Sequence, residues 1–196
     1  MGSKMTRQER SGTIIFIDEN LEDKKVGILS IPWPPVPQQI ISRIREKHLL
    51  YDEMKWSTVS RVKVPFLTEV IETFFKNRSF GRMTVAPIST TLDQAIFQAL
   101  QDIHPFSSPY HGIFIDEHTT PKGYEFERKL RTAFKCNCVL RLDSKATQLL
   151  QLCDLMLNLV IRAGAPTAPQ SKHKADLVDI FQAAQSRASQ QRCFLL

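Results

Sequence analysis

The sequence predicts an α/β fold in which helices flank a single mixed sheet of five strands. Short runs rich in β-branched and aromatic residues alternate with stretches of helical period through the second half of the chain. Near the start, two such runs are separated only by a short polar turn, which indicates a hairpin. This order favours three antiparallel strands followed by parallel ones, with a helical insert between the second and third strands at about residues 38–77.

The first half of the chain contains three of the five predicted strands. "GTIIFIDEN" and "VGILSI" are joined by the polar turn "LEDKK", and "PWPPVP" ends the second strand because proline cannot extend a sheet ladder. In the insert, "QQIISRIREKHLL" and "VPFLTEVIETFFKN" carry apolar residues at helical spacing, whereas "YDEMKWSTVSRVK" between them is irregular. "FGRMTVAPI" is the third strand. We therefore expect strands at 12–20, 26–31 and 80–88, and helices at 38–50 and 64–77.

The second half alternates helices and strands. "STTLDQAIFQALQDI" opens with capping hydroxyl residues and continues with helical period. "HGIFIDE" and "NCVLRLD" are strands, separated by the charged helix "TPKGYEFERKLRTAF". A long apolar helix, "SKATQLLQLCDLMLNLVIRA", ends at "GAPTAP". The last helix, "KADLVDIFQAAQSRASQ", is polar and is expected to pack through Leu177, Val178, Ile180 and Phe181.

These elements divide the chain into three parts. Residues 1–12 are expected to be a disordered or vector-derived N-terminus, because "MGSKMTRQER" is polar and basic with no apolar region after it. Residues 13–163 form the α/β domain. Residues 164–196 are a linker and the C-terminal helix, which either folds onto the domain or pairs with a second chain.

Composition limits the classes of function. The formal net charge of +6 and the sequence pI of about 9.3 favour a polyanionic partner, and the positive residues are spread along the chain. The longest nearly uncharged apolar segment, Leu149–Ile161, is too short to span a bilayer, so no membrane partner is expected. The four cysteines lack C-x-x-C spacing, which argues against a zinc site and favours reduced thiols in a cytoplasmic protein.

The pentapeptide IFIDE occurs twice, at Ile15–Glu19 and at Ile113–Glu117. The first copy precedes a hairpin and the second precedes a helix, so the pair is not an internal repeat. Each copy places carboxylates at the end of an apolar strand, where open α/β sheets build their sites. Successive side chains of a strand face opposite ways, so Asp18 and Asp116 are the candidates and the adjoining Glu residues point away. The plainer interpretation of either copy alone is a strand exit with ordinary polar residues.

The long apolar helix contains one carboxylate, Asp154, within a stripe of polar residues spaced about one per turn: Thr147, Gln151, Asp154, Asn158 and Arg162. An exposed helical face would carry more Lys and Glu, so this stripe indicates a buried helix that faces a polar site. A buried carboxylate requires a partner or a cation. A hydrogen-bonded Asp of the core is the alternative interpretation.

Three Asp residues brought together would repel each other unless a cation lay among them. Carboxylate oxygens suit Mg²⁺ or Mn²⁺, and such sites activate water for phosphodiester cleavage. Other chemistries lack a pattern, because the sequence contains no G-x-G-x-x-G, no G-x-x-x-x-G-K-[ST], no G-x-S-x-G and no H-E-x-x-H. The residues themselves therefore point to Asp18, Asp116 and Asp154 as metal ligands.

Four segments resemble a known family. "FIDEN", "YDEMKWS", "IFIDEH" and "LDSKATQLLQLCDLMLNLVIR" are similar, in sequence and order, to motifs of the domain of unknown function 3800 family, over about Thr13 to Arg162. That family is regarded as RNase H-like, which agrees with the predicted order of elements. The chain departs from the pattern at Asn20, where Ser is usual, at Leu21, where Gly is frequent, and at Cys153, where Ala is usual.

The resemblance implies an RNase H-like metal site at Asp18, Asp116 and Asp154, with Glu53 of the "YDEMKWS" segment as a fourth carboxylate. It also implies that the "DSK" element either lines the site through Ser144 or caps the long helix. Lys55 and Lys145 are candidate contacts for phosphate oxygens, or simply solvated lysines. In the same way, Trp56 is a candidate for stacking on a base, or a packing residue.

These inferences predict a metal-dependent nuclease, a phosphodiester hydrolase that uses Mg²⁺ or Mn²⁺ and acts on DNA or RNA. The alternative is a non-catalytic module that keeps the fold and binds nucleic acid or protein. Association into a homo-oligomer is left open. Three carboxylates within about 5 Å of one point would favour the metal site over the binding module.

Overall fold

The structure is a computed structural model that describes residues 12–107, 109–117, 119, 124–145, 147–165 and 171–193. Except for Gly12, the expected disordered N-terminus lies outside these residues, as does most of the expected linker between the last two helices.

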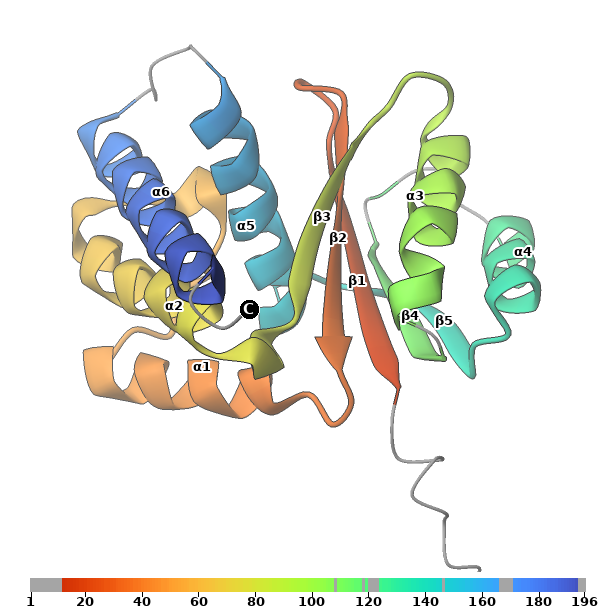
Figure 1. Cartoon of the computed structure of the whole chain (residues 1–196), viewed down its shortest axis with the longest axis horizontal. Coiled ribbons are helices and arrows are strands. Elements are labelled where there is room, and N and C mark those ends of the chain that lie inside the picture. Colours follow the sequence, from red (N-terminus) through yellow and green to blue (C-terminus); the bar gives the residue numbers. More distant parts are fainter. Residues whose placement is uncertain are drawn as a thin grey trace, which may run out of the picture.

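A five-stranded mixed sheet forms the centre of the molecule (Figure 1). The strand order is β3-β2-β1-β4-β5. β2 pairs antiparallel with β1 and with β3, while β4 pairs parallel with β1 and with β5. The predicted mixed sheet, antiparallel at one end and parallel at the other, is therefore confirmed. The strands are β1 Thr13–Asn20, β2 Lys25–Pro32, β3 Arg82–Pro87, β4 Tyr110–Asp116 and β5 Cys138–Leu142.

Helices cover both faces of the sheet (Figure 1). α1, α2, α5 and α6 lie on one face, and α3 and α4 lie on the other. The insert between β2 and β3 holds α1, α2 and three short 3-10 turns, and so extends slightly beyond the predicted 38–77. The elements are α1 Val36–His48, η2 Trp56–Thr58, η3 Arg61–Lys63, α2 Val64–Lys76, η4 Arg78–Phe80, α3 Leu92–Ser107, α4 Tyr124–Phe134, α5 Gln148–Gly164 and α6 Lys172–Cys193.

The central strand β1 is apolar on both faces because each face meets a core. Ile14 and Phe16 belong to the core beneath α5, whereas Ile15 and Ile17 belong to the core beneath α3. Side chains alternate along a strand, so the uninterrupted apolar run of β1 is the pattern expected for a strand buried on both sides. This parity decides which face each residue after the run can reach.

The C-terminal helix α6 packs on its own chain. Leu177, Val178 and Phe181 are buried in the core that α2 and α5 share, and Ile180 packs against it. The predicted packing residues are thus confirmed, and α6 folds onto the domain. Among the described residues, no helix is long and apolar enough to cross a membrane.

Candidate functional site

Asp18 and Asp116 lie at the carboxyl ends of neighbouring parallel strands. β1 and β4 stay paired up to Ile17 and Ile115, and each Asp is the next residue. The Phe residue two positions before each Asp packs toward α5, and the two rings stack with centroids 5.3 Å apart. By strand parity, both Asp side chains therefore lie on the α5 face. The expectation that the two IFIDE copies bring one Asp each to a common face is confirmed.

Asp154 lies on α5, which packs against this face of β1. One carboxylate oxygen of Asp154 accepts a 2.7 Å hydrogen bond from the backbone N–H of Trp56. The other accepts one of 3.2 Å from the side-chain amide of Asn158. Gln151 and Asn158, one turn to either side of Asp154, are buried. The polar stripe is therefore not a solvated face, as predicted.

The carboxylates act on one another through their charges. Burial raises the pKa of Asp18 well above its usual value, and the charges of Asp154, Glu19 and Asp116 raise it further. Burial also raises the pKa of Asp154, and the charge of Asp116 adds to the effect. The N–H of Trp56 and nearby lysines oppose this shift in Asp154. We call Asp18, Glu19, Asp116 and Asp154 the carboxylate cluster.

Glu19 acts electrostatically on the other carboxylates of the cluster, which the sequence did not predict. As expected for a residue next to Asp18 in a strand, its side chain points to the other face, where it accepts a hydrogen bond from the hydroxyl of Thr119. Burial nevertheless raises the pKa of Glu19, and the charge of Asp116 raises it further, whereas Arg141 lowers it. Glu19 is therefore part of the electrostatic group, although it faces away.

The chemistry of this donor set fits a hard divalent cation, because it consists of carboxylate oxygens that repel one another. The positions of the described side chains, in contrast to their chemistry, do not form a metal site. Within the ranges that the structure describes, no group of three His, Cys, Asp or Glu side chains is arranged to hold a metal ion. Asp18, Asp116 and Asp154 thus share a face and an electrostatic environment without forming a closed ligand set.

Gln151 fixes the insert to α5. Its side-chain carbonyl oxygen accepts hydrogen bonds from the backbone N–H of Met54 (2.9 Å) and the guanidinium of Arg45 (2.9 Å). Its amide nitrogen donates to the carbonyl oxygens of Ser144 (2.9 Å) and Lys145 (2.9 Å). One buried amide therefore joins the "YDEMKWS" and "DSK" segments to the helix that carries the third Asp.

The "YDEMKWS" segment is also held from its other side. The buried guanidinium of Arg45 donates to the carbonyl oxygen of Asp52, and the buried ammonium of Lys63 donates to that of Glu53. The hydrogen bond from Trp56 to Asp154 completes the attachment. An irregular segment is thus fixed through its backbone beside the carboxylate cluster.

The other residues implied by the resemblance have different surroundings. Lys55 is close enough to Asp154 to lower its pKa, whereas the Lys145 side chain is exposed. The half-buried Glu53 is not among the main charges acting on Asp18 or Asp154. The hydroxyl of Ser144 is buried without a hydrogen-bond partner among the described residues.

Trp56 is a packing residue in this fold. Its side chain is 8% exposed and belongs to the core, and Lys174 of α6 lies over its ring at 5.0 Å from the centroid. The "DSK" element does not cap α5 through a side chain, because the helix begins after Thr147 with no side-chain capping bond. The carboxylate of Asp143 instead accepts the backbone N–H of Lys145.

Sequence reasoning missed two contributors to the site. The charge of Lys174 lowers the pKa of Asp154, and nothing in the run "SKHK" shows which element α6 approaches. Asn20 donates a 3.0 Å hydrogen bond to the side-chain oxygen of Asn158, and its own side-chain oxygen accepts a hydrogen bond from the backbone N–H of Asp23 in the hairpin turn. Asn20 therefore links the β1–β2 hairpin to α5.

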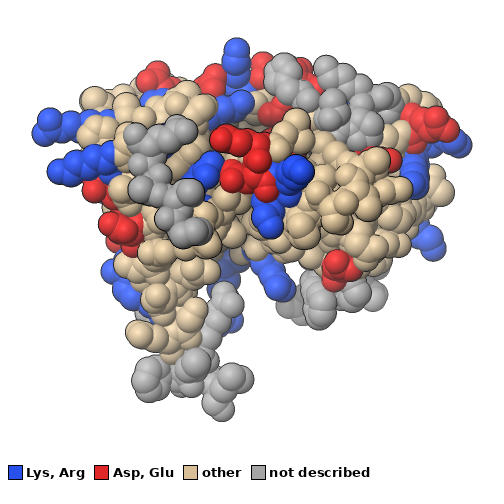
Figure 2. Space-filling model, turned by 90° about the horizontal axis from the view of Figure 1, so that it is seen from above, with Lys and Arg blue, Asp and Glu red and all other residues tan. Residues whose placement is uncertain are grey.

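Viewed from above, Lys and Arg side chains are interspersed with Asp and Glu (Figure 2). Although the net charge is +6, the positive side chains do not form one continuous surface on this face.

A scan against protein-family models finds no match to this sequence, and a search of curated proteins finds none either.

Proposed function

We propose that this chain is a Mg²⁺- or Mn²⁺-dependent phosphodiesterase of RNase H-like fold that cleaves nucleic acid. One observation carries the proposal: carboxylates from the ends of two adjacent parallel strands and from the helix above them share a face, and burial together with neighbouring carboxylate charges raises the pKa of Asp18 and of Asp154. Buried like charges are unfavourable without a cation, so their gathering is most simply explained by a site that binds one.

The arrangement of strands supports the finer assignment of the fold. Three antiparallel strands, then two parallel ones, with β1 in the middle of the sheet, is the order expected of an RNase H-like domain. The resemblance to the domain of unknown function 3800 family implies the same fold. Both lead to Asp18, Asp116 and Asp154 as the proposed metal ligands, with Glu53 as a predicted fourth carboxylate.

A bound divalent cation would supply an activated water and would stabilise the leaving oxygen of a phosphodiester. The chain's own residues would orient the ligands. The Trp56 N–H and the Asn158 amide hold the carboxylate of Asp154 in place. The positive charges of Lys55 and Lys174 act on the same carboxylate, and we propose that these two side chains bind phosphate oxygens of the substrate.

The test is cleavage of labelled single-stranded, duplex and RNA–DNA hybrid oligonucleotides with Mg²⁺, Mn²⁺ or chelator. We expect cleavage to require the metal and Asp116→Asn to lower it by about a hundredfold or more. The matched control is Asp102→Asn, because Asp102 is exposed on α3 and, among the described residues, its carboxylate accepts a hydrogen bond only from Gln98, one turn away. Metal-independent cleavage, or equal loss in both variants, would contradict the assignment.

The second candidate is a non-catalytic module that binds nucleic acid or protein. The carboxylate positions favour it, because no described group of three ligand-type side chains is arranged to hold a metal. It predicts binding of nucleic acid that is unchanged by chelator and by Asp116→Asn, with no product under any metal condition. Gel-shift and cleavage measurements on the same oligonucleotides separate the two candidates.

A further inference from the structure

A second polar site lies on the α3 face, at the end of the strands away from the carboxylate cluster. It is a pocket of about 190 Å³ lined by Thr13, Ser30, Arg82, Thr84 and Ile103, among others. Thr13 comes five residues before Asp18 in β1, which places the pocket about 17 Å from that carboxylate along the strand. The pocket is therefore separate from the proposed catalytic site.

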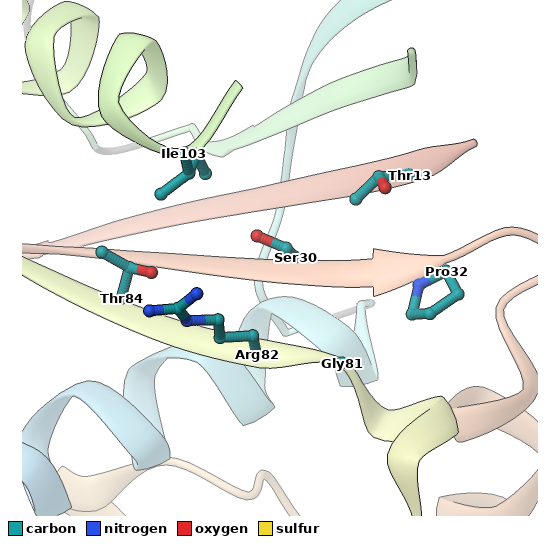
Figure 3. Close-up of a pocket in the computed structure, with 7 residues that line it drawn as sticks. All are labelled: Thr13, Ser30, Pro32, Gly81, Arg82, Thr84 and Ile103. Atoms are coloured by element: carbon teal, nitrogen blue, oxygen red, sulfur yellow. The ribbon is translucent and has the colours of Figure 1, made fainter. Parts of the chain in front are cut away.

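Polar residues replace apolar ones here on three adjacent strands. Ser30 of β2 pairs with Arg82 of β3, and Thr84 lies two residues further along β3 on the same side. Thr13 shares the parity of Ile15 in β1, which packs beneath α3. Figure 3 shows the guanidinium of Arg82 with the hydroxyls of Ser30 and Thr84 around the space below Ile103.

Two donor groups of this pocket, on Thr84 and Arg82, lack a partner of their own among the described residues. The hydroxyl oxygen of Thr84 is buried and makes no hydrogen bond. Arg82 forms no ion pair with a described residue, and no acidic side chain lines the pocket. A buried hydroxyl without a partner is unfavourable, because its hydrogen bonds to water are lost without replacement. The pocket thus offers the positive charge of the exposed Arg82 side chain and the hydroxyl groups of Thr13, Ser30 and Thr84, and none of its lining residues is acidic.

We propose that this pocket binds a phosphate group. The guanidinium and the hydroxyls on three strands are hydrogen-bond donors, so they complement a ligand with several acceptor oxygens. The single positive charge favours an anion. A tetrahedral phosphate carries enough oxygens to reach donors on more than one strand, since neighbouring strands are about 4.8 Å apart. The group is either inorganic phosphate or the terminal phosphate of a nucleotide or oligonucleotide.

The test is a titration of the intact protein with inorganic phosphate, followed by backbone amide NMR shifts and by the thermal unfolding midpoint. We expect shifts at Gly81, Arg82 and Thr84 and a higher midpoint. Arg82→Ala and Thr84→Val should each weaken binding about tenfold or more, because each removes a donor to a charged ligand. Arg61→Ala is the matched control, since Arg61 is exposed and lines none of the pockets described here.

Thr84→Val has a second readout, because valine keeps the shape of threonine and removes the unpartnered hydroxyl. The phosphate-free variant should be at least as stable as the original protein, while losing the response to phosphate. The proposal is overturned if phosphate causes no shifts in this pocket, or if binding survives both substitutions and therefore takes place elsewhere.

A 5′-phosphorylated oligonucleotide and its unphosphorylated twin identify the source of the group. Displacement of inorganic phosphate by the phosphorylated strand alone would assign the pocket to a nucleic-acid end. Binding of inorganic phosphate without such displacement would assign it to a small free phosphate. The Asp116→Asn variant should bind phosphate normally, so failure of the nuclease proposal and failure of this one remain distinguishable.

Discussion

Replacing Gln151 by leucine should destabilise the protein strongly, because this buried side chain satisfies four groups. Its carbonyl oxygen accepts from Met54 and Arg45, and its amide donates to the carbonyls of Ser144 and Lys145, each at 2.9 Å. Leucine has a similar volume and forms none of these bonds. The guanidinium of Arg45, only 5% exposed as a residue, would lose its side-chain acceptor.

The expected cost is about 3–5 kcal/mol. A neutral hydrogen bond contributes about 1 kcal/mol net and one to a charged group about 2 kcal/mol, and the freed backbone groups recover part of this by meeting water. The assay is urea unfolding followed by circular dichroism, with the free energy extrapolated to water. Gln148→Leu on the same helix is the matched control, because Gln148 is only half-buried and accepts a single long bond of 3.4 Å from Ser42.

The control should lose no more than about 1 kcal/mol. A Gln151→Leu variant that unfolds at the same urea concentration as Gln148→Leu would show that this amide does not hold the insert to α5. The inference that the insert is fixed beside Asp154 through α5 would then be wrong.

Three further substitutions test other parts of the structure. Without divalent cations, Asp18→Asn should raise the unfolding midpoint at neutral pH, because the pKa of Asp18 is raised in the folded protein and its ionisation therefore lowers stability as the pH rises. The gain should vanish below about pH 4, where the carboxyl group is protonated in both the folded and the unfolded protein. Lys174→Met should cost about 0.5–1 kcal/mol in urea unfolding through the lost contact with the indole ring, and Lys172→Met almost nothing. Gly81→Ala should lower the free energy of unfolding by about 3 kcal/mol or more, because Gly81 has φ of 83° and a Cβ there would lie 1.8 Å from a β2 carbonyl oxygen. Gly164→Ala is the control, since a Cβ at Gly164 would meet nothing within 4 Å.

The local sequence pattern was sufficient to predict the helices and strands, and also the face of the sheet on which the two strand-end Asp side chains lie. Successive side chains of a strand alternate between the two faces of the sheet. The position of Asp18 or Asp116 after its apolar run therefore determines the face on which the carboxylate lies once the strands pair. The spacing of the polar residues on α5 likewise predicted that Asp154 faces inward, because helical period is also a local property.

The remaining features depend on contacts between residues distant in sequence. Lys174 approaches Trp56 only because α6 packs back across the insert, and no periodicity within α6 encodes its position. The pocket around the buried hydroxyl of Thr84 lies where β1 and β3 begin and β2 ends, so it exists only once these three strands have paired. Glu19 joins the carboxylate cluster electrostatically because charges act across a strand as well as on one face of it.

Anomalous diffraction from a Mn²⁺-soaked crystal tests the proposed metal site most directly. We expect a Mn²⁺ peak between the carboxylates of Asp18, Asp116 and Asp154, and its loss in Asp116→Asn with the fold unchanged. A crystal in which these three carboxylates stay apart and bind no Mn²⁺, while the ion is bound elsewhere or not at all, would contradict the metal-dependent phosphodiesterase.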